Sequence, residues 1–92
     1  MPDGGEPPAD AYGQAVRCFE IIAAALAEHG ASPAHVVRTR MYLSSGADWQ
    51  DVGRAHAEMF GDVRPASTMV LITGFVDPSF LVEIEADALL PE

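Results

Sequence analysis

The chain has 92 residues, 14 of them acidic and five basic, which gives a formal net charge of −9. This length fits one domain, and 49% hydrophobic against 21% charged residues is typical of a globular chain. The negative charge disfavours nucleic acid as a partner, because its phosphates would be repelled. All five basic residues are arginines, so lysine Schiff-base chemistry and a P-loop lysine are excluded.

No apolar run approaches the roughly 18 residues of a membrane span. The start of the chain is acidic and rich in proline and glycine, unlike a signal peptide. A lone cysteine, Cys18, excludes a disulfide within the chain and a cysteine-based zinc site. We therefore expect a cytoplasmic protein without a membrane partner.

Residues 1–9 contain three prolines and two glycines and are expected to form a tail or loop, which leaves residues 10–92 as the single domain. A helix is predicted over residues 10–29, with Asp10 as its N-cap and Gly30 just past its end. Its apolar residues recur at spacings of three and four, which places them on one face. They are Tyr12, Val16, Phe19, Ile22, Ala23 and Leu26.

A single helical turn is predicted to start at Ser32 and Pro33, followed by a strand over residues 36–44. Alternation along this strand gives one apolar face and one cationic face. The apolar face has Val37, Thr39, Met41 and Leu43, and the other has Arg38, Arg40 and Tyr42.

A second helix is predicted over residues 48–60, capped by Asp48. Its expected inner stripe is Trp49, Val52, Ala55, His56 and Met59. Strands over residues 67–74 and 80–89 follow. The last strand places Glu83, Glu85 and Asp87 on the face opposite Val82, Ile84 and Ala86.

The predicted order of helix, strand, helix, strand, strand indicates an α+β fold with both helices on one face of a small sheet. Arg38 and Arg40 can then pair with the acidic residues of the last strand across the other face. Two interpretations of that face stay open. It is either a solvated surface with weak ion pairs, or a subunit interface or ligand cleft, which Tyr42 and Leu81 favour.

The closing stretch resembles the signature of the RidA/YjgF family, also known as the L-PSP endoribonuclease family. The resemblance is carried by residues 63–70, Asp77-Pro78 and residues 81–86, and extends to the predicted first helix and first strand. It implies a chorismate-mutase-like α+β fold and a homotrimer with ligand pockets between subunits. It also implies hydrolysis of reactive enamines and imines, such as 2-aminoacrylate, to keto acids and ammonia.

Carried onto this chain, the resemblance implies that Glu83 positions or activates water. The family's carboxylate-binding arginine is replaced by Ser67, and a position that is often cysteine in the family is Met69. Arg64 could supply a guanidinium from another attachment point. The family also has an N-terminal hairpin that this chain lacks, so we expect either a neighbouring subunit to cover the bare strand edge or a natural protein that starts earlier.

The remaining candidates have structural interpretations. His29, His35 and His56 lack the spacing of a metal site, so no metal and no cofactor are expected. Packing roles are predicted for His56, Cys18 and Trp49. Two main functions stay open: an imine or enamine hydrolase that relies on Glu83, and a non-catalytic homotrimer that binds small carboxylates. Ribonuclease or translation-inhibitor activity ranks last, because the chain is acidic and has no lysine.

Overall fold

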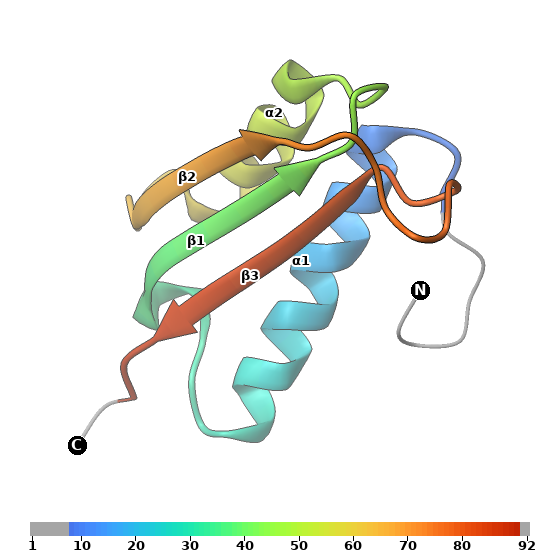
Figure 1. The fold of residues 1–92 in the computed structure, drawn as a ribbon. Coiled ribbons are helices and arrows are strands. Elements are labelled where there is room, and N and C mark those ends of the chain that lie inside the picture. The colour runs from blue at the N-terminus through green and yellow to red at the C-terminus, as the bar shows by residue number, and fades with distance from the viewer. Residues whose placement is uncertain (1–7, 91–92) are drawn as a thin grey trace.

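The computed structural model describes residues 8–90, in which two helices lie on one face of a three-stranded sheet and leave the other face uncovered (Figure 1). Along the chain these are α1 (Ala11–Glu28), η1 (Pro33–His35), β1 (Val36–Leu43), α2 (Trp49–Phe60), β2 (Ala66–Leu71) and β3 (Val82–Ala88). The sheet order is β2-β1-β3, with β1 parallel to β2 and antiparallel to β3. The predicted α+β fold with both helices on one face is confirmed.

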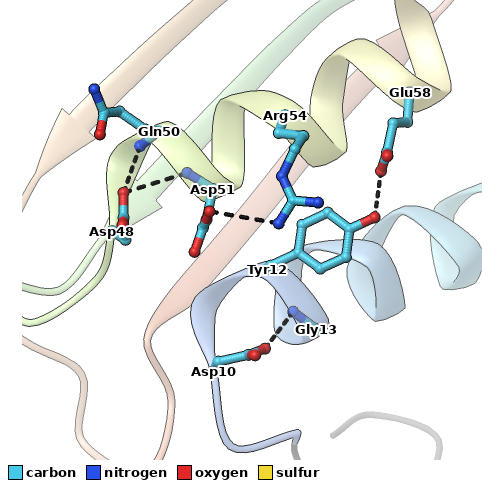
Figure 2. Close-up of polar contacts among 8 residues, drawn as sticks. All are labelled: Asp10, Tyr12, Gly13, Asp48, Gln50, Asp51, Arg54 and Glu58. Carbon is cyan, nitrogen blue, oxygen red and sulfur yellow. Dashed lines mark hydrogen bonds and ion pairs between the residues drawn. The ribbon is translucent and has the colours of Figure 1, made fainter.

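The bounds of α1 follow the sequence prediction closely. Asp10 is the N-cap, where its carboxylate accepts a hydrogen bond of 2.7 Å from the N–H of Gly13 (Figure 2). Gly30 follows the helix with a φ of 75°, a left-handed conformation that favours glycine. Of the tail predicted over residues 1–9, residues 1–7 lie outside the described residues. Pro8 and Ala9 precede the helix without regular structure.

The buried face of α1 is rotated from the predicted stripe. Its centre is Ala11, Ala15 and Phe19, together with Gln14, whereas Tyr12, Val16 and Ile22 are only half-buried. Small alanine side chains let the helix backbone approach its neighbours closely, so the alanines lie innermost and the larger residues fill the flanks.

Gln14 is the buried polar residue that fastens α1 to the segment before β3. Its side chain is 1% exposed. Nε2 donates to the carbonyl oxygens of Pro8 at 2.9 Å and Ser79 at 2.8 Å. Oε1 accepts from the N–H of Leu81 at 2.7 Å. The amide thus supplies hydrogen-bond partners for three backbone groups that have none within a strand or helix.

One prediction for β1 is wrong because of a β-bulge. The register against β3 shifts between Val36 and Arg38. As a result Val36 is 3% exposed and Val37, which was predicted to face inward, is 44% exposed. Beyond the bulge the alternation is as predicted: Thr39, Met41 and Leu43 are buried beneath the helices.

The start of α2 confirms one prediction and contradicts another. Oδ1 of Asp48 caps the helix by accepting from the N–H of Gln50 at 2.9 Å and of Asp51 at 3.3 Å (Figure 2). Trp49, which was predicted to pack, is 57% exposed. Trp49 is the first residue of the helix, whereas Phe60 at the opposite end is buried in the core.

The two later strands are shorter than predicted. β2 ends at Leu71, and β3 begins at Val82 because a turn holds the segment before it. In that turn Oδ1 of Asp77 accepts from the N–H and Oγ of Ser79 at 2.9 and 2.7 Å. Among the described residues, no helix has the length and apolar character needed to cross a membrane.

Candidate functional site

The uncovered face of the sheet is the charged face that the alternation predicted. Arg40 on β1 lies in register with Glu85 on β3, and Arg38 lies in register with Asp87. The Arg40 guanidinium contacts both oxygens of Asp87, at 3.1 and 3.3 Å, and its Nε lies 3.6 Å from Oε1 of Glu85. The predicted pairing across strands is therefore confirmed for Arg40.

These contacts set the protonation of the face. The hydrogen bond from Arg40 holds the pKa of the Asp87 carboxyl below its ordinary value. A hydrogen bond to Glu85 raises the pKa of the Tyr42 phenol. The centre of the face is a paired array in which the guanidinium of Arg40 is already engaged by carboxylates.

Glu83 lies two residues before Glu85, near the start of β3 and opposite Tyr42 in the register, with an exposed side chain. No ion pair to Glu83 is found among residues 8–90. It borders a recess of about 530 Å³ between α1 and the edge of β3 that faces away from β1, which we name the edge recess. The edge recess is lined by Cys18, Ile21, Ile22, Phe75, Val76, Asp77, Phe80, Val82, Glu83 and Ile84.

Cys18 is half-buried in the wall of the edge recess and packs against the core, as predicted. Burial raises the pKa of its thiol, and the negative charge of Glu83 raises it further. A thiol with a raised pKa is a poor nucleophile at neutral pH, because the thiolate is the reactive form. Cys18 therefore contributes packing to this wall.

Ser67 and Met69 lie on the opposite side of the sheet from Glu83. In the parallel pairing they are level with Thr39 and Met41, whose side chains are buried under the helices. The hydroxyl of Ser67 accepts a hydrogen bond of 2.9 Å from Thr39 and donates one of 3.2 Å to the carbonyl of Pro65. Ser67 is thus held in a local polar network.

His56 completes that network, which we define as Thr39, His56 and Ser67. Its Nε2 lies 2.9 Å from Oγ1 of Thr39 and 3.2 Å from Oγ of Ser67. The ring packs against Phe19 and Phe60, with centroids 5.7 and 5.1 Å away. Burial lowers the pKa of His56, which favours the neutral ring.

The predicted packing role of His56 is confirmed, but its pairing with Ser67 was not foreseen. The available signal was Thr39, a polar residue at an inward position of an otherwise apolar strand. Such a hydroxyl needs a hydrogen-bond partner inside the fold.

One copy of the chain does not bring the predicted site residues together. Glu83 and Ser67 are on the two strands that flank β1, whose backbones are about 10 Å apart, and on opposite faces. Arg64 lies in the turn before β2 with a φ of 55° and an exposed side chain. Any site that uses both Glu83 and Ser67 therefore needs a second copy.

A separate exposed cluster joins α1 to α2 (Figure 2). The guanidinium carbon of Arg54 lies 3.8 Å from the ring centroid of Tyr12, and the Tyr12 hydroxyl donates to Glu58 at 2.5 Å. The hydrogen bond to Glu58 raises the pKa of the Tyr12 phenol. This cluster fastens the two helices.

Within residues 8–90, no three His, Cys, Asp or Glu side chains gather as metal ligands would.

Two helices on one face of a mixed sheet, with a charged face left open, define a small α+β domain. The family model described as Endoribonuclease L-PSP matches residues 2–90. The chain belongs to this family, the RidA/YjgF family that the closing motif indicated.

The relatives are longer than this chain. The uncharacterized protein SCO2049 of Streptomyces coelicolor is 40% identical over 86% of the chain, which spans 59% of that protein. A crystal structure of a YjgF/YER057c/UK114 family member from Mycobacterium tuberculosis is 42% identical, with a TM-score of 0.86 over 90% of this chain and 70% of that one. A Rid family protein from Yersinia pestis is 26% identical, with a TM-score of 0.82 over 98% and 71%.

Proposed function

We propose that this protein is a hydrolase of small reactive enamines and imines, of the 2-aminoacrylate type, that works as a homotrimer with Glu83 as the base. The observation that carries the proposal is the exposed Glu83 carboxylate, which has no ion pair among the described residues while Glu85 and Asp87 are both engaged by Arg40. A carboxylate that is not neutralised by a cation can accept a proton from water.

The reaction needs one proton acceptor and one water molecule. After the enamine tautomerises to the imine, water attacks the imine carbon while the Glu83 carboxylate takes a proton from that water. The proton then passes to the nitrogen, which gives a carbinolamine. Glu83 next carries the proton of the new hydroxyl to the amino group, the carbon–oxygen double bond forms as the carbon–nitrogen bond breaks, and a keto acid and ammonia leave. General base catalysis of this kind contributes about 10²–10⁴-fold.

The homotrimer is part of the proposal because the site residues are split in a single copy. Glu83 on the open face of one copy can meet the β2 edge of another, which bears Ser67 and Met69 and follows the turn with Arg64. Light scattering measures this directly: a molar mass three times that of the chain is expected, and a monomer would remove the site.

The activity test generates 2-aminoacrylate in situ and follows its decay against a buffer control. The wild-type protein is expected to accelerate the decay, and Glu83→Gln is expected to lose about 100-fold or more of that acceleration. Glu20→Gln, an exposed carboxylate on α1, serves as the matched control. Equal rates for Glu83→Gln and the wild type would rule out Glu83 as the base.

A second candidate is a non-catalytic homotrimer that binds small carboxylates. It is favoured by Ser67, which stands in place of the family's arginine and whose hydroxyl is held by Thr39 and Pro65, so a group used for the chemistry is missing and Arg64 is the cation left to hold a carboxylate. A thermal-shift panel of small carboxylates and keto acids tests it, with Arg64→Gln as the variant that should lose any stabilisation. Ribonuclease activity ranks last, because a net charge of −9 repels RNA.

A further inference from the structure

The network of Thr39, His56 and Ser67 joins a hydroxyl that solvent reaches to an imidazole and a buried hydroxyl. Ser67 is exposed, His56 is half-buried, and Thr39 is 0% exposed. The three groups come from β2, α2 and β1, so they meet only in the folded chain. A serine hydroxyl beside an imidazole is the pair on which serine nucleophiles depend, because the imidazole takes the hydroxyl proton.

The proton of the Ser67 hydroxyl has two acceptors at equal distance. Oγ lies 3.2 Å from the carbonyl oxygen of Pro65 and 3.2 Å from Nε2 of His56. Rotation about the Cβ–Oγ bond turns the proton from one acceptor to the other while both side chains stay in place. In the tautomer that has its proton on Nδ1, Nε2 has a lone pair that can take the Ser67 proton.

The surroundings of His56 suit a proton acceptor. Its ring packs against Phe19 and Phe60, which fixes the direction in which Nε2 points. Burial lowers the pKa of the ring, so the neutral form with a free lone pair is favoured at neutral pH. The imidazole is therefore oriented and unprotonated before any substrate arrives.

Thr39 positions both members of the pair. Its hydroxyl donates to Oγ of Ser67 at 2.9 Å, and its Oγ1 lies 2.9 Å from Nε2 of His56. When Ser67 loses its proton, the donor from Thr39 stabilises the negative charge that develops on Oγ. The new Nε2–H can then donate to Oγ1 of Thr39. A buried hydroxyl that contacts both groups thus supports the proton transfer between them.

We propose that Ser67 is a nucleophile that takes small acyl groups from activated esters, with His56 as its general base. Oγ bonds to the acyl carbon as the Ser67 proton moves to Nε2, and the tetrahedral intermediate expels an aryloxide or thiolate. The imidazolium returns its proton to this leaving group or to solvent. Water then attacks the acyl-serine and gives a proton to Nε2, the proton passes to Oγ, and a carboxylic acid leaves.

Activated esters are the substrate class because their leaving group departs as a stable anion and needs no acid on the protein. This activity is independent of the proposed imine hydrolysis, since it uses no group of β3 and is complete within one copy of the chain. The two activities can therefore be gained or lost separately.

The test incubates the protein with p-nitrophenyl acetate, quenches with acid and locates acetyl groups by peptide mass spectrometry. The chain has no lysine, so few other side chains compete for the acetyl group. Ser45, an exposed serine in the loop after β1, is the internal control within the same molecule. Ser67 is expected to be acetylated about 100-fold faster or more than Ser45, the factor that a general base supplies.

Variants separate the roles. Ser67→Ala is expected to lose the burst of p-nitrophenolate that accompanies acetylation. His56→Gln is expected to slow acetylation of Ser67 about 100-fold or more. Thr68→Ala removes the next hydroxyl on β2, which lies level with Arg40 on the open face, and should leave acetylation of Ser67 unchanged. Urea-unfolded wild type should lose the preference for Ser67 over Ser45, which serves as the test should His56→Gln fail to fold.

Three results would overturn the proposal. They are equal acetylation of Ser67 and Ser45 in the folded wild type, release of p-nitrophenolate by Ser67→Ala at the wild-type rate, and undiminished acetylation of Ser67 in a folded His56→Gln. A preference for Ser67 that persisted in urea would equally refute it, because the network would then not be its cause.

Discussion

Replacing Gln14 by methionine tests whether this buried amide holds α1 to the chain before β3. Methionine has nearly the same length and keeps the apolar volume, but it cannot bond the carbonyls of Pro8 and Ser79 or the N–H of Leu81. Each lost hydrogen bond contributes about 1 kcal/mol, so Gln14→Met is expected to lower the free energy of unfolding by about 3 kcal/mol.

A change of this size is a large part of the total stability of a small domain, which is about 5–15 kcal/mol. It corresponds to a fall in Tm of roughly 12–24 °C for a chain of this length. Urea unfolding followed by far-ultraviolet circular dichroism measures it, with all variants at one protein concentration because association would add to the apparent stability.

Gln50→Met is the matched control, because Gln50 is exposed and only its backbone N–H contacts the Asp48 cap. It is expected to change the free energy of unfolding by less than about 0.5 kcal/mol. If Gln14→Met were as mild as Gln50→Met, the three hydrogen bonds would not be what holds α1 in place.

Three further predictions concern single groups. Burial lowers the pKa of His56, so the folded state favours the neutral ring. The contribution of this neutral ring to stability is fully present above the unfolded pKa of about 6.5 and is lost as the pH falls through the folded pKa. Urea titrations across that pH window should show this loss of stability in the wild type and a weaker loss in His56→Gln. Gly53→Ala, inside α2 with open space at the new Cβ, is expected to raise stability by about 0.5–1 kcal/mol, whereas Gly30→Ala, at a φ of 75°, should lower Tm; thermal unfolding of both separates helix propensity from backbone strain. Arg40→Gln should raise the pKa of Asp87 toward its ordinary value, and an unmoved value in a carboxyl NMR titration would contradict the assigned ion pair.

Much of the fold could be predicted because its signals are local. Asp10 and Asp48 satisfy free N–H groups within three residues, and the alternation along β3 separates Glu83 and Glu85 from Ile84 wherever that strand lies. The RidA/YjgF motif was likewise readable, since it lies within one continuous stretch.

The remaining features depend on contacts between distant segments. The bulge at Val36 reflects register against β3, and Trp49 is exposed although its helical spacing places it on the inner stripe, so neither follows from helical or strand periodicity. The pairing of His56 with Ser67 joins α2 to β2, and Gln14 reaches residues more than sixty positions away. Placing Ser67 and Glu83 on opposite faces required the strand order itself.

The central position of β1 has a consequence during biosynthesis. Both strands that pair with β1 come later in the chain. During synthesis, β1 therefore emerges with two unpaired edges and an apolar stripe that includes Met41 and Leu43. Such a segment is prone to aggregate before its partners exist. Arg38 and Arg40 interrupt this stripe with positive charge, which disfavours aggregation of the unfinished chain before Arg40 pairs with the carboxylates of β3.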